Sequence, residues 1–272
     1  MKKIKLFLIA SVLFCLSSCF NKPAFRFTNF YGTPAEKIAK AIKRNDVDII
    51  RNEVVNHHIN VNYKDKKYEV SLLVLALTNN KKPAFNELLK LGADPNIKSS
   101  DCVSPLICAI RYNKNCDLYY VNELLKYDAA ITPEFFKQCG VFSSDPICET
   151  ITIYNEKSTI KCGLQILKKL TDKLNDPNLL FRYNNAKNYR ENIIYHCLSS
   201  SKNLAALKYL IVDLKYKVPK EIYIDGTVQE YFTKGFNSLT NILKSEDFKF
   251  KSEDLNSIKN EIIDYLNTYH YD

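Results

Sequence analysis

Two short apolar stretches of the chain begin in the same way and lie 33 residues apart. Residues 71–77 read SLLVLAL, and residues 104–110 read SPLICAI. In each stretch a serine precedes a run of apolar residues, as expected where a serine side chain caps a new helix. Pro105 suits the first helical position, where its missing N–H leaves nothing unsatisfied. A unit that recurs at this period predicts a stack of repeated helical units.

A second helix is predicted after each of these stretches. Residues 83–91 and 118–127 both carry apolar positions at helical spacing. Gly92, in LLKLGADPN, stands where a left-handed residue closes a helix, a conformation that a Cβ would strain. Residues 94–96, Asp-Pro-Asn, then turn the chain outward. The sequence therefore predicts an all-α fold built from helix pairs.

The segments GADPN and SPLICAI resemble the GADVN and TPLHLAA of ankyrin repeats. The stretch 35–62 fits one earlier unit, with the turn between its helices at Asn45–Asp46. The resemblance implies an ankyrin-type solenoid of helix pairs over residues 34–130. The chain departs from the family pattern because Val74 and Ile107 replace the usual histidine and most of the repeat glycines are missing.

Residues 131–272 match the repeat less closely. We expect them to form divergent ankyrin-like helical repeats and a cap, because the last unit of a solenoid leaves one face open. Helical patterns cover residues 147–154, 161–174, 192–198, 204–214, 228–243 and 255–269.

The chain begins MKKIKLFLIASVLFCLSSC, in which three lysines precede an apolar run at residues 6–16. This run is shorter than the roughly 20 residues that span a bilayer, and it has the length of a signal-peptide core. Its end, LSSC, resembles the lipobox of bacterial lipoproteins. The resemblance implies a signal peptide at residues 1–18 and a lipid on Cys19; an ordinary secretory peptide is the alternative. Residues 19–33 lack periodicity and are expected to form a tether.

Phe20 follows the cysteine at the place where an aspartate marks inner-membrane retention in some bacteria. The resemblance therefore implies an outer-membrane lipoprotein that faces the periplasm. Removing residues 1–18 removes three lysines, which leaves 36 basic residues against 30 acidic ones and a net charge of +6. No basic run reaches five residues, so the charge pattern does not predict nucleic-acid binding. It favours an acidic partner or anionic headgroups, or a merely soluble surface.

Seven cysteines follow Cys19, and an extracytoplasmic location would permit disulfides. Cys108 and Cys197 lie in apolar helical runs and are expected in the core. Cys139 and Cys148 flank a short Gly/Ser/Pro segment and are candidates for a pair. The chain has no C-x-x-C, and its histidines are not at ligand spacing with cysteines, so no metal site is predicted.

Motifs of nucleotide-binding loops, serine hydrolases and zinc proteases are absent from the sequence. The carboxylates Asp145, Glu149, Glu253 and Asp254 fall at predicted helix starts, where they complement the helix dipole. His196 is expected to be a buried residue of its repeat. The sequence therefore predicts no catalytic residue and no cofactor.

Ankyrin-like proteins bind partners through loop tips and the adjoining positions of the inner helices, and exposed Tyr and Arg are typical binding anchors. By this resemblance the partner-binding candidates are Tyr63, Lys64, Tyr68, Thr78, Asn79, Lys98, Arg111, Tyr112, Arg182 and Tyr183. The alternative is that these positions are solvated tips.

The sequence as a whole predicts a lipid-anchored, non-enzymatic monomer that binds an unidentified protein. Immunity against a toxin delivered to the periplasm is one such role. A structural or enzyme-assisting scaffold is a second class of function, and an enzyme whose site no motif reveals is a third.

Overall fold

The computed structural model describes residues 23–113, 115–131, 145–154, 158–174, 193–199, 203–216, 218, 222–224, 235–245, 250 and 252–268. The chain divides into two compact units, Met1–Ala130 and Ile131–Asp272.

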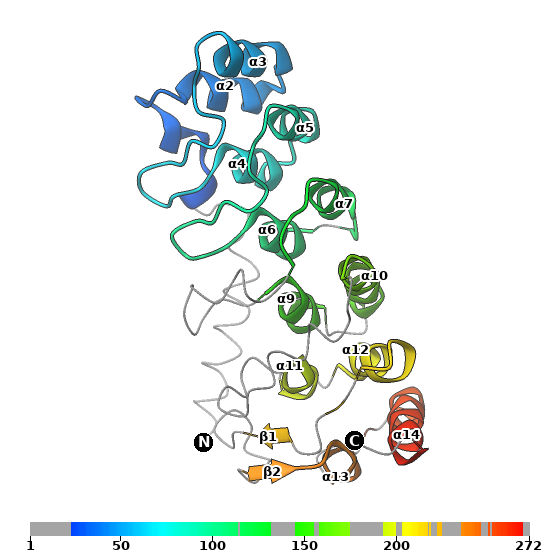
Figure 1. Cartoon of the computed structure of the whole chain (residues 1–272). Helices are drawn as coiled ribbons and strands as arrows, with labels where there is room; N and C mark the ends of the chain where they lie inside the picture. The colour runs from blue at the N-terminus through cyan, green and yellow to red at the C-terminus, as the bar shows by residue number, and fades with distance from the viewer. Residues whose placement is uncertain are drawn as a thin grey trace. The chain divides into compact units, whose positions relative to one another are not determined.

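The first unit contains consecutive helix pairs. They are α2 (Glu36–Arg44) with α3 (Val47–Val55), α4 (Leu72–Thr78) with α5 (Lys82–Lys90), and α6 (Pro105–Arg111) with α7 (Tyr119–Lys126). Helices α2, α4 and α6 contact one another in succession, and α3 contacts α5 beside them (Figure 1). The first helices of the pairs thus form one row, and the second helices form another.

Serine caps begin the two apolar helices, as predicted. The Ser71 hydroxyl accepts a hydrogen bond from the backbone N–H of Val74, and the Ser104 hydroxyl accepts one from Ile107. Pro105 is the first residue of α6. All residues from 72 to 77 and from 105 to 110 are buried. These two helices therefore lie inside the core, which explains why both sequences are apolar throughout.

Left-handed residues end helices at recurring places. Gly92 has a φ of +89° after α5, as predicted, and Asp128 has a φ of 57° after α7. Asn45 and Asn80, in the turns between paired helices, have φ values of 57° and 53°. Asn and Asp tolerate this conformation better than other residues with a Cβ. Asn45, Asn80 and Asp128 therefore adopt at these places a conformation that glycine adopts most readily.

Hydrogen bonds join loop positions that are about one sequence repeat apart. The Asn62 side-chain oxygen accepts a bond of 2.7 Å from the N–H of Asp94, 32 residues later. The Asn96 side-chain oxygen accepts one of 2.6 Å from the N–H of Ala130, 34 residues later. The period seen in the sequence is therefore also a period of contacts in space.

Residues 23–33 differ from the predicted tether, because they pack against helices of the first unit. They form two 3₁₀ helices, η2 (Pro23–Phe25) and η3 (Phe27–Phe30), which contact α4 and α2 respectively. The Phe30 side chain is fully buried. Its burial depends on contacts with residues far away in the sequence and produces no local periodicity.

The described part of the second unit includes two further helix pairs. They are α9 (Pro146–Ile153) with α10 (Ile160–Thr171), and α11 (Ile193–Ser199) with α12 (Leu204–Lys208), which continues into a π-helical turn, Tyr209–Asp213. Helix α9 contacts α11, and α10 contacts α12. Buried Asn203 caps α12 and also donates to the carbonyls of Ile151 and Tyr154 at the end of α9. This side chain therefore links the two pairs.

The end of the second unit includes a short antiparallel strand pair. Strands β1 (Ile222–Ile224) and β2 (Gly235–Asn237) precede α13 (Leu239–Lys244) and α14 (Glu253–Thr268). The helix predicted over 228–243 is therefore wrong at residues 235–237, which pair with β1, and it is confirmed at 239–243, which belong to α13 after the Ser238 cap; residues 228–234 lie outside the described residues. The described part of the chain is otherwise helical, which confirms the all-α class.

Candidate functional site

The loop before α4 is organised around one buried carboxylate. Asp65 is 1% exposed, and its oxygens accept hydrogen bonds from the backbone N–H groups of Lys67, Tyr68 and Val70 at 2.9–3.0 Å. A carboxylate that accepts several backbone N–H groups fixes the turn around it. Asp65 thus fixes the backbone that carries the exposed side chains of Lys66, Lys67 and Glu69.

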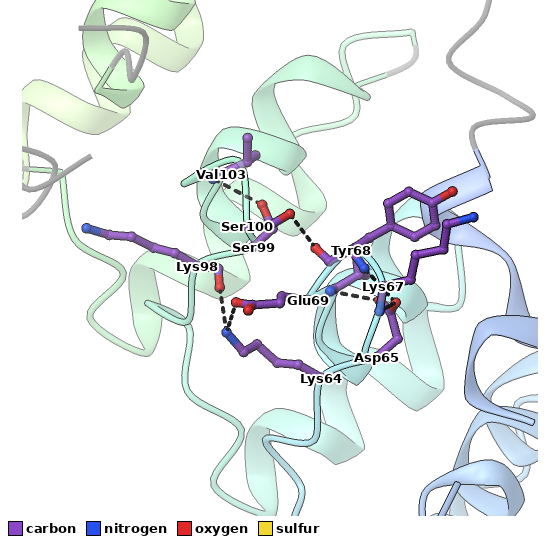
Figure 2. A network of polar contacts seen from close by, with 10 residues as sticks. Lys64, Asp65, Lys67, Tyr68, Glu69, Lys98, Ser99, Ser100 and Val103 are labelled. Carbon is purple, nitrogen blue, oxygen red and sulfur yellow. Dashed lines mark hydrogen bonds and ion pairs between the residues drawn. The ribbon is translucent and has the colours of Figure 1, made fainter. Parts of the chain in front are cut away.

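Three predicted partner-binding residues, Lys64, Tyr68 and Lys98, lie where this loop contacts the loop before α6, although the Lys98 side chain and the Tyr68 ring point away from each other (Figure 2). The Lys64 ammonium lies 2.7 Å from a Glu69 carboxylate oxygen and donates to the Lys98 carbonyl at 3.3 Å. The Ser100 hydroxyl donates to the Tyr68 carbonyl at 3.0 Å, which joins the loops a second time (Figure 2). Lys64, Tyr68, Glu69 and Lys98 are called the fingertip patch below.

The fingertip patch combines charge with an aromatic ring. The Tyr68 side chain is half-buried, and the ammonium of neighbouring Lys67 lies 5.0 Å from the centre of its ring. Partial burial lowers the pKa of the Lys98 ammonium below its ordinary value. A surface of this kind can offer both ion pairs and apolar contact to a protein partner.

The candidates on the inner helices lie in a different environment. The Asn79 amide nitrogen donates to the Phe25 carbonyl at 3.1 Å, and the Phe25 ring meets the Tyr112 ring edge-on, with centroids 5.3 Å apart. Asn79 and Tyr112, called the helix-end site below, are thus in contact with the N-terminal segment. The Thr78 hydroxyl is bonded to the Val74 carbonyl of its own helix, and Arg111 is exposed at the end of α6.

Tyr63 also contacts the N-terminal segment. Its ring lies 6.3 Å from that of buried Phe30. It therefore contributes to the packing of that segment as well as to the surface. The remaining candidates, Cys19, Arg182 and Tyr183, lie outside the described residues.

Asp65 and Phe25, which make contacts at this surface, were not among the predicted site residues. The Asp65 carboxylate accepts hydrogen bonds from the N–H groups of Lys67 and Tyr68, two and three residues later, as in an Asx turn. An aspartate in a polar loop is the sequence signal for such a turn. Phe25 lies among the closely spaced aromatics of PAFRFTNF, but nothing local indicates what its ring contacts.

The cysteines in the described ranges divide into two groups. Cys102, Cys116 and Cys162 are disulfide-bonded. Cys108, Cys148 and Cys197 are free and buried, which confirms the core placement of Cys108 and Cys197. The suggested pair of Cys139 and Cys148 is wrong, because Cys148 is a free thiol.

The described core contains ionisable groups whose pKa values are raised by burial. Burial raises the pKa of the Cys148 and Cys197 thiols, and nearby Asp145 raises that of Cys148 further, so both stay protonated near neutral pH. Asp145 caps α9, as predicted for a carboxylate at a helix start. In the described part of the chain, no group of three or more His, Cys, Asp or Glu residues could hold a metal ion.

None of the helices within the described ranges is long and apolar enough to cross a bilayer. A comparison with protein-family models finds no match to this chain, and a comparison with curated proteins finds no similar sequence.

Proposed function

We propose that the protein is a lipid-anchored protein of the bacterial envelope that binds another protein through the loop tips of an ankyrin-type solenoid. The solenoid is supported by helix pairs that stack in two rows and by hydrogen bonds between positions 32–34 residues apart. The serine-capped apolar helices and the left-handed residues after α5 and α7 support the same arrangement.

The observation that carries the binding function is the fingertip patch. Two successive loops contribute to it, and Lys64 joins them through the Lys98 carbonyl. Buried Asp65 fixes the first loop without help from a ligand. A surface that is ordered before binding loses little conformational entropy when it meets its partner.

The envelope location is supported by the lipobox-like LSSC and by the disulfide-bonded cysteines. Disulfides persist in oxidising compartments such as the periplasm and are rare in the cytosol. A small binding protein held at the membrane there is suited to neutralise an incoming toxin, which is the role that we propose for it.

The anchor is tested with Cys19→Ala. This variant should lose its lipid and move from the membrane pellet to the soluble fraction, because a multiply acylated cysteine holds by about 0.8 kcal/mol for each buried CH₂. Phe20→Ala, which leaves the cysteine in place, is the matched control. Unchanged pelleting of Cys19→Ala, with an unchanged mass of the mature N-terminus, would rule out lipidation.

The binding function is tested by capture from envelope extract. The wild-type chain should retain a specific protein, and the triple variant Lys64→Ala/Tyr68→Ala/Lys98→Ala should not. Lys90→Ala, at an exposed position of α5, is the control. Equal capture by the triple variant would show that the partner binds elsewhere, and cleavage or modification of the partner would show that the protein is an enzyme.

A further inference from the structure

The helix-end site is filled by the chain's own N-terminal segment. Phe25 supplies both contacts: its ring lies on Tyr112, and its carbonyl accepts the bond from Asn79. The two partners belong to successive first helices, because Asn79 directly follows α4 and Tyr112 directly follows α6. Phe25 therefore contacts two neighbouring helix pairs of the first unit at once.

Asn79 is held ready for this contact. Its amide nitrogen also donates to the Leu75 carbonyl of α4 at 2.9 Å. An amide group carries two N–H bonds, so one fixes the side chain to its helix while the other is directed to the carbonyl of the bound residue. This donor recognises a backbone carbonyl, and the Tyr112 ring recognises an aromatic side chain edge-on.

The N-terminal segment is attached unevenly along its length. Phe30 is fully buried, and the Thr33 hydroxyl donates to its carbonyl at 2.6 Å. Phe25, in contrast, is only half-buried, and Arg26 beside it is exposed. The segment can therefore open at Phe25 while it remains attached at Phe30.

We propose that the helix-end site binds an aromatic residue of the partner protein, which displaces Phe25. This inference rests on the proposed protein-binding function. The partner segment offers an aromatic side chain to Tyr112 and its own backbone carbonyl to Asn79, as Phe25 does. In the free protein Phe25 acts as a competing internal ligand, and it lowers the apparent affinity in proportion to the fraction of molecules in which it is bound.

A peptide of the chain's own sequence tests the site without any knowledge of the partner. The probe is fluorescein-labelled KPAFRFTN, residues 22–29, and the protein is the full chain carrying Cys19→Ala. The Phe25→Ala variant removes the competing ring and leaves the ring position of the site vacant, while residue 25 keeps its backbone carbonyl. It should bind the peptide about ten-fold more tightly than the chain with Phe25 if the Phe25 ring is bound in about nine molecules of ten. Adding Asn79→Ala should weaken binding to the vacant site about five-fold, because one hydrogen bond is lost.

The matched controls are an Arg26→Ala chain and a peptide with alanine in place of its first phenylalanine. The Arg26→Ala chain should bind the peptide as wild type does, and the altered peptide should not bind the vacant site. Equal binding of the probe to the Phe25→Ala chain and to wild type, or no binding to either, would overturn the proposal.

A second variant reports the displacement directly. The chain contains no tryptophan, so Phe25→Trp introduces a single reporter. Its emission should be blue-shifted in the free protein and should move to the red when excess peptide is added or when Tyr112→Ala removes the ring contact. An emission like that of exposed tryptophan, unaffected by Tyr112→Ala, would contradict the bound position of residue 25.

These outcomes are separate from those of the proposed function. A chain that binds the peptide but captures no envelope protein would contradict the proposed function alone. A captured partner whose affinity is the same for Phe25→Ala and wild type would contradict this inference alone.

Discussion

Arg51 and Glu87 form an ion pair between consecutive helix pairs of the first unit, with the guanidinium Nε 2.8 Å from a carboxylate oxygen. The Glu87 side chain, on α5, is 7% exposed, whereas that of Arg51, on α3, is 53% exposed. The buried carboxylate therefore depends on this partner more than the arginine does. Glu53, at the corresponding position of α3, is also buried and pairs with Lys37 at 3.4 Å.

Arg51→Ala should lower the free energy of unfolding by about 1–3 kcal/mol, because it leaves a buried carboxylate without its charged donor. Urea unfolding followed by circular dichroism measures the change. Lys90→Ala, on the exposed side of α5, should change stability by less than about 0.5 kcal/mol. Equal effects of the two variants would show that the ion pair contributes nothing.

Gly92 and Asp128 are left-handed residues that follow α5 and α7, and substitutions at the two positions should change stability in opposite directions. Gly92→Ala should cost about 1 kcal/mol in stability; space is open around a Cβ there, so the cost comes from the backbone alone. Asp128→Gly should stabilise by a few tenths of a kcal/mol up to about 1 kcal/mol. The melting temperatures of the two variants should therefore shift in opposite directions, and a neutral Gly92→Ala would contradict the left-handed assignment.

Leu106 of α6 is fully buried, as predicted, and Leu125 of α7 is also buried, at 6% exposed. Leu106→Ala should cost about 2–5 kcal/mol, because it removes buried methyl groups and leaves a cavity. Leu125→Ala should cost the same or less. Chemical denaturation of both variants measures these values, and a loss below about 1 kcal/mol for Leu106→Ala would place this residue outside the core.

The free cysteines should resist alkylation in the native protein. Burial raises the pKa of Cys148 and Cys197, so little thiolate forms at pH 8, and Cys108 is shielded by its position in α6. Peptide mass mapping with iodoacetamide should find these three cysteines modified only after unfolding. Cys102, Cys116 and Cys162 should need a reductant as well, and their modification without one would contradict their disulfides.

The repeated units were predictable because each carries its own local signals. The serine caps, the proline at the start of α6 and the left-handed Gly92 act within a few residues of their positions. The N-terminal segment carried no such signal, because Phe25 and Phe30 are held by residues distant in the sequence. The strands β1 and β2 are three residues each, too short to show an alternating pattern.

The candidate residues were predicted to lie on loop tips and helix ends, and the structure shows what the described ones contact. The loop that carries Lys64 and Tyr68 contacts the loop that carries Lys98 through the backbone carbonyls of Tyr68 and Lys98, because the loops repeat in register. Tyr63 and Tyr112 were expected to be free surface anchors, but they pack on Phe30 and Phe25. A tyrosine has the same sequence signature in both situations, so only the tertiary structure distinguishes them.

The fingertip patch is tested most directly by calorimetry with the purified partner, once capture has identified it. The Lys64→Ala/Tyr68→Ala/Lys98→Ala variant should bind more weakly by more than about 2 kcal/mol, or roughly thirty-fold, if the patch contains anchor residues. The Lys90→Ala variant, changed at an exposed position of α5, should bind as wild type does. A triple variant with wild-type affinity and an unchanged circular dichroism spectrum would contradict the proposed binding surface.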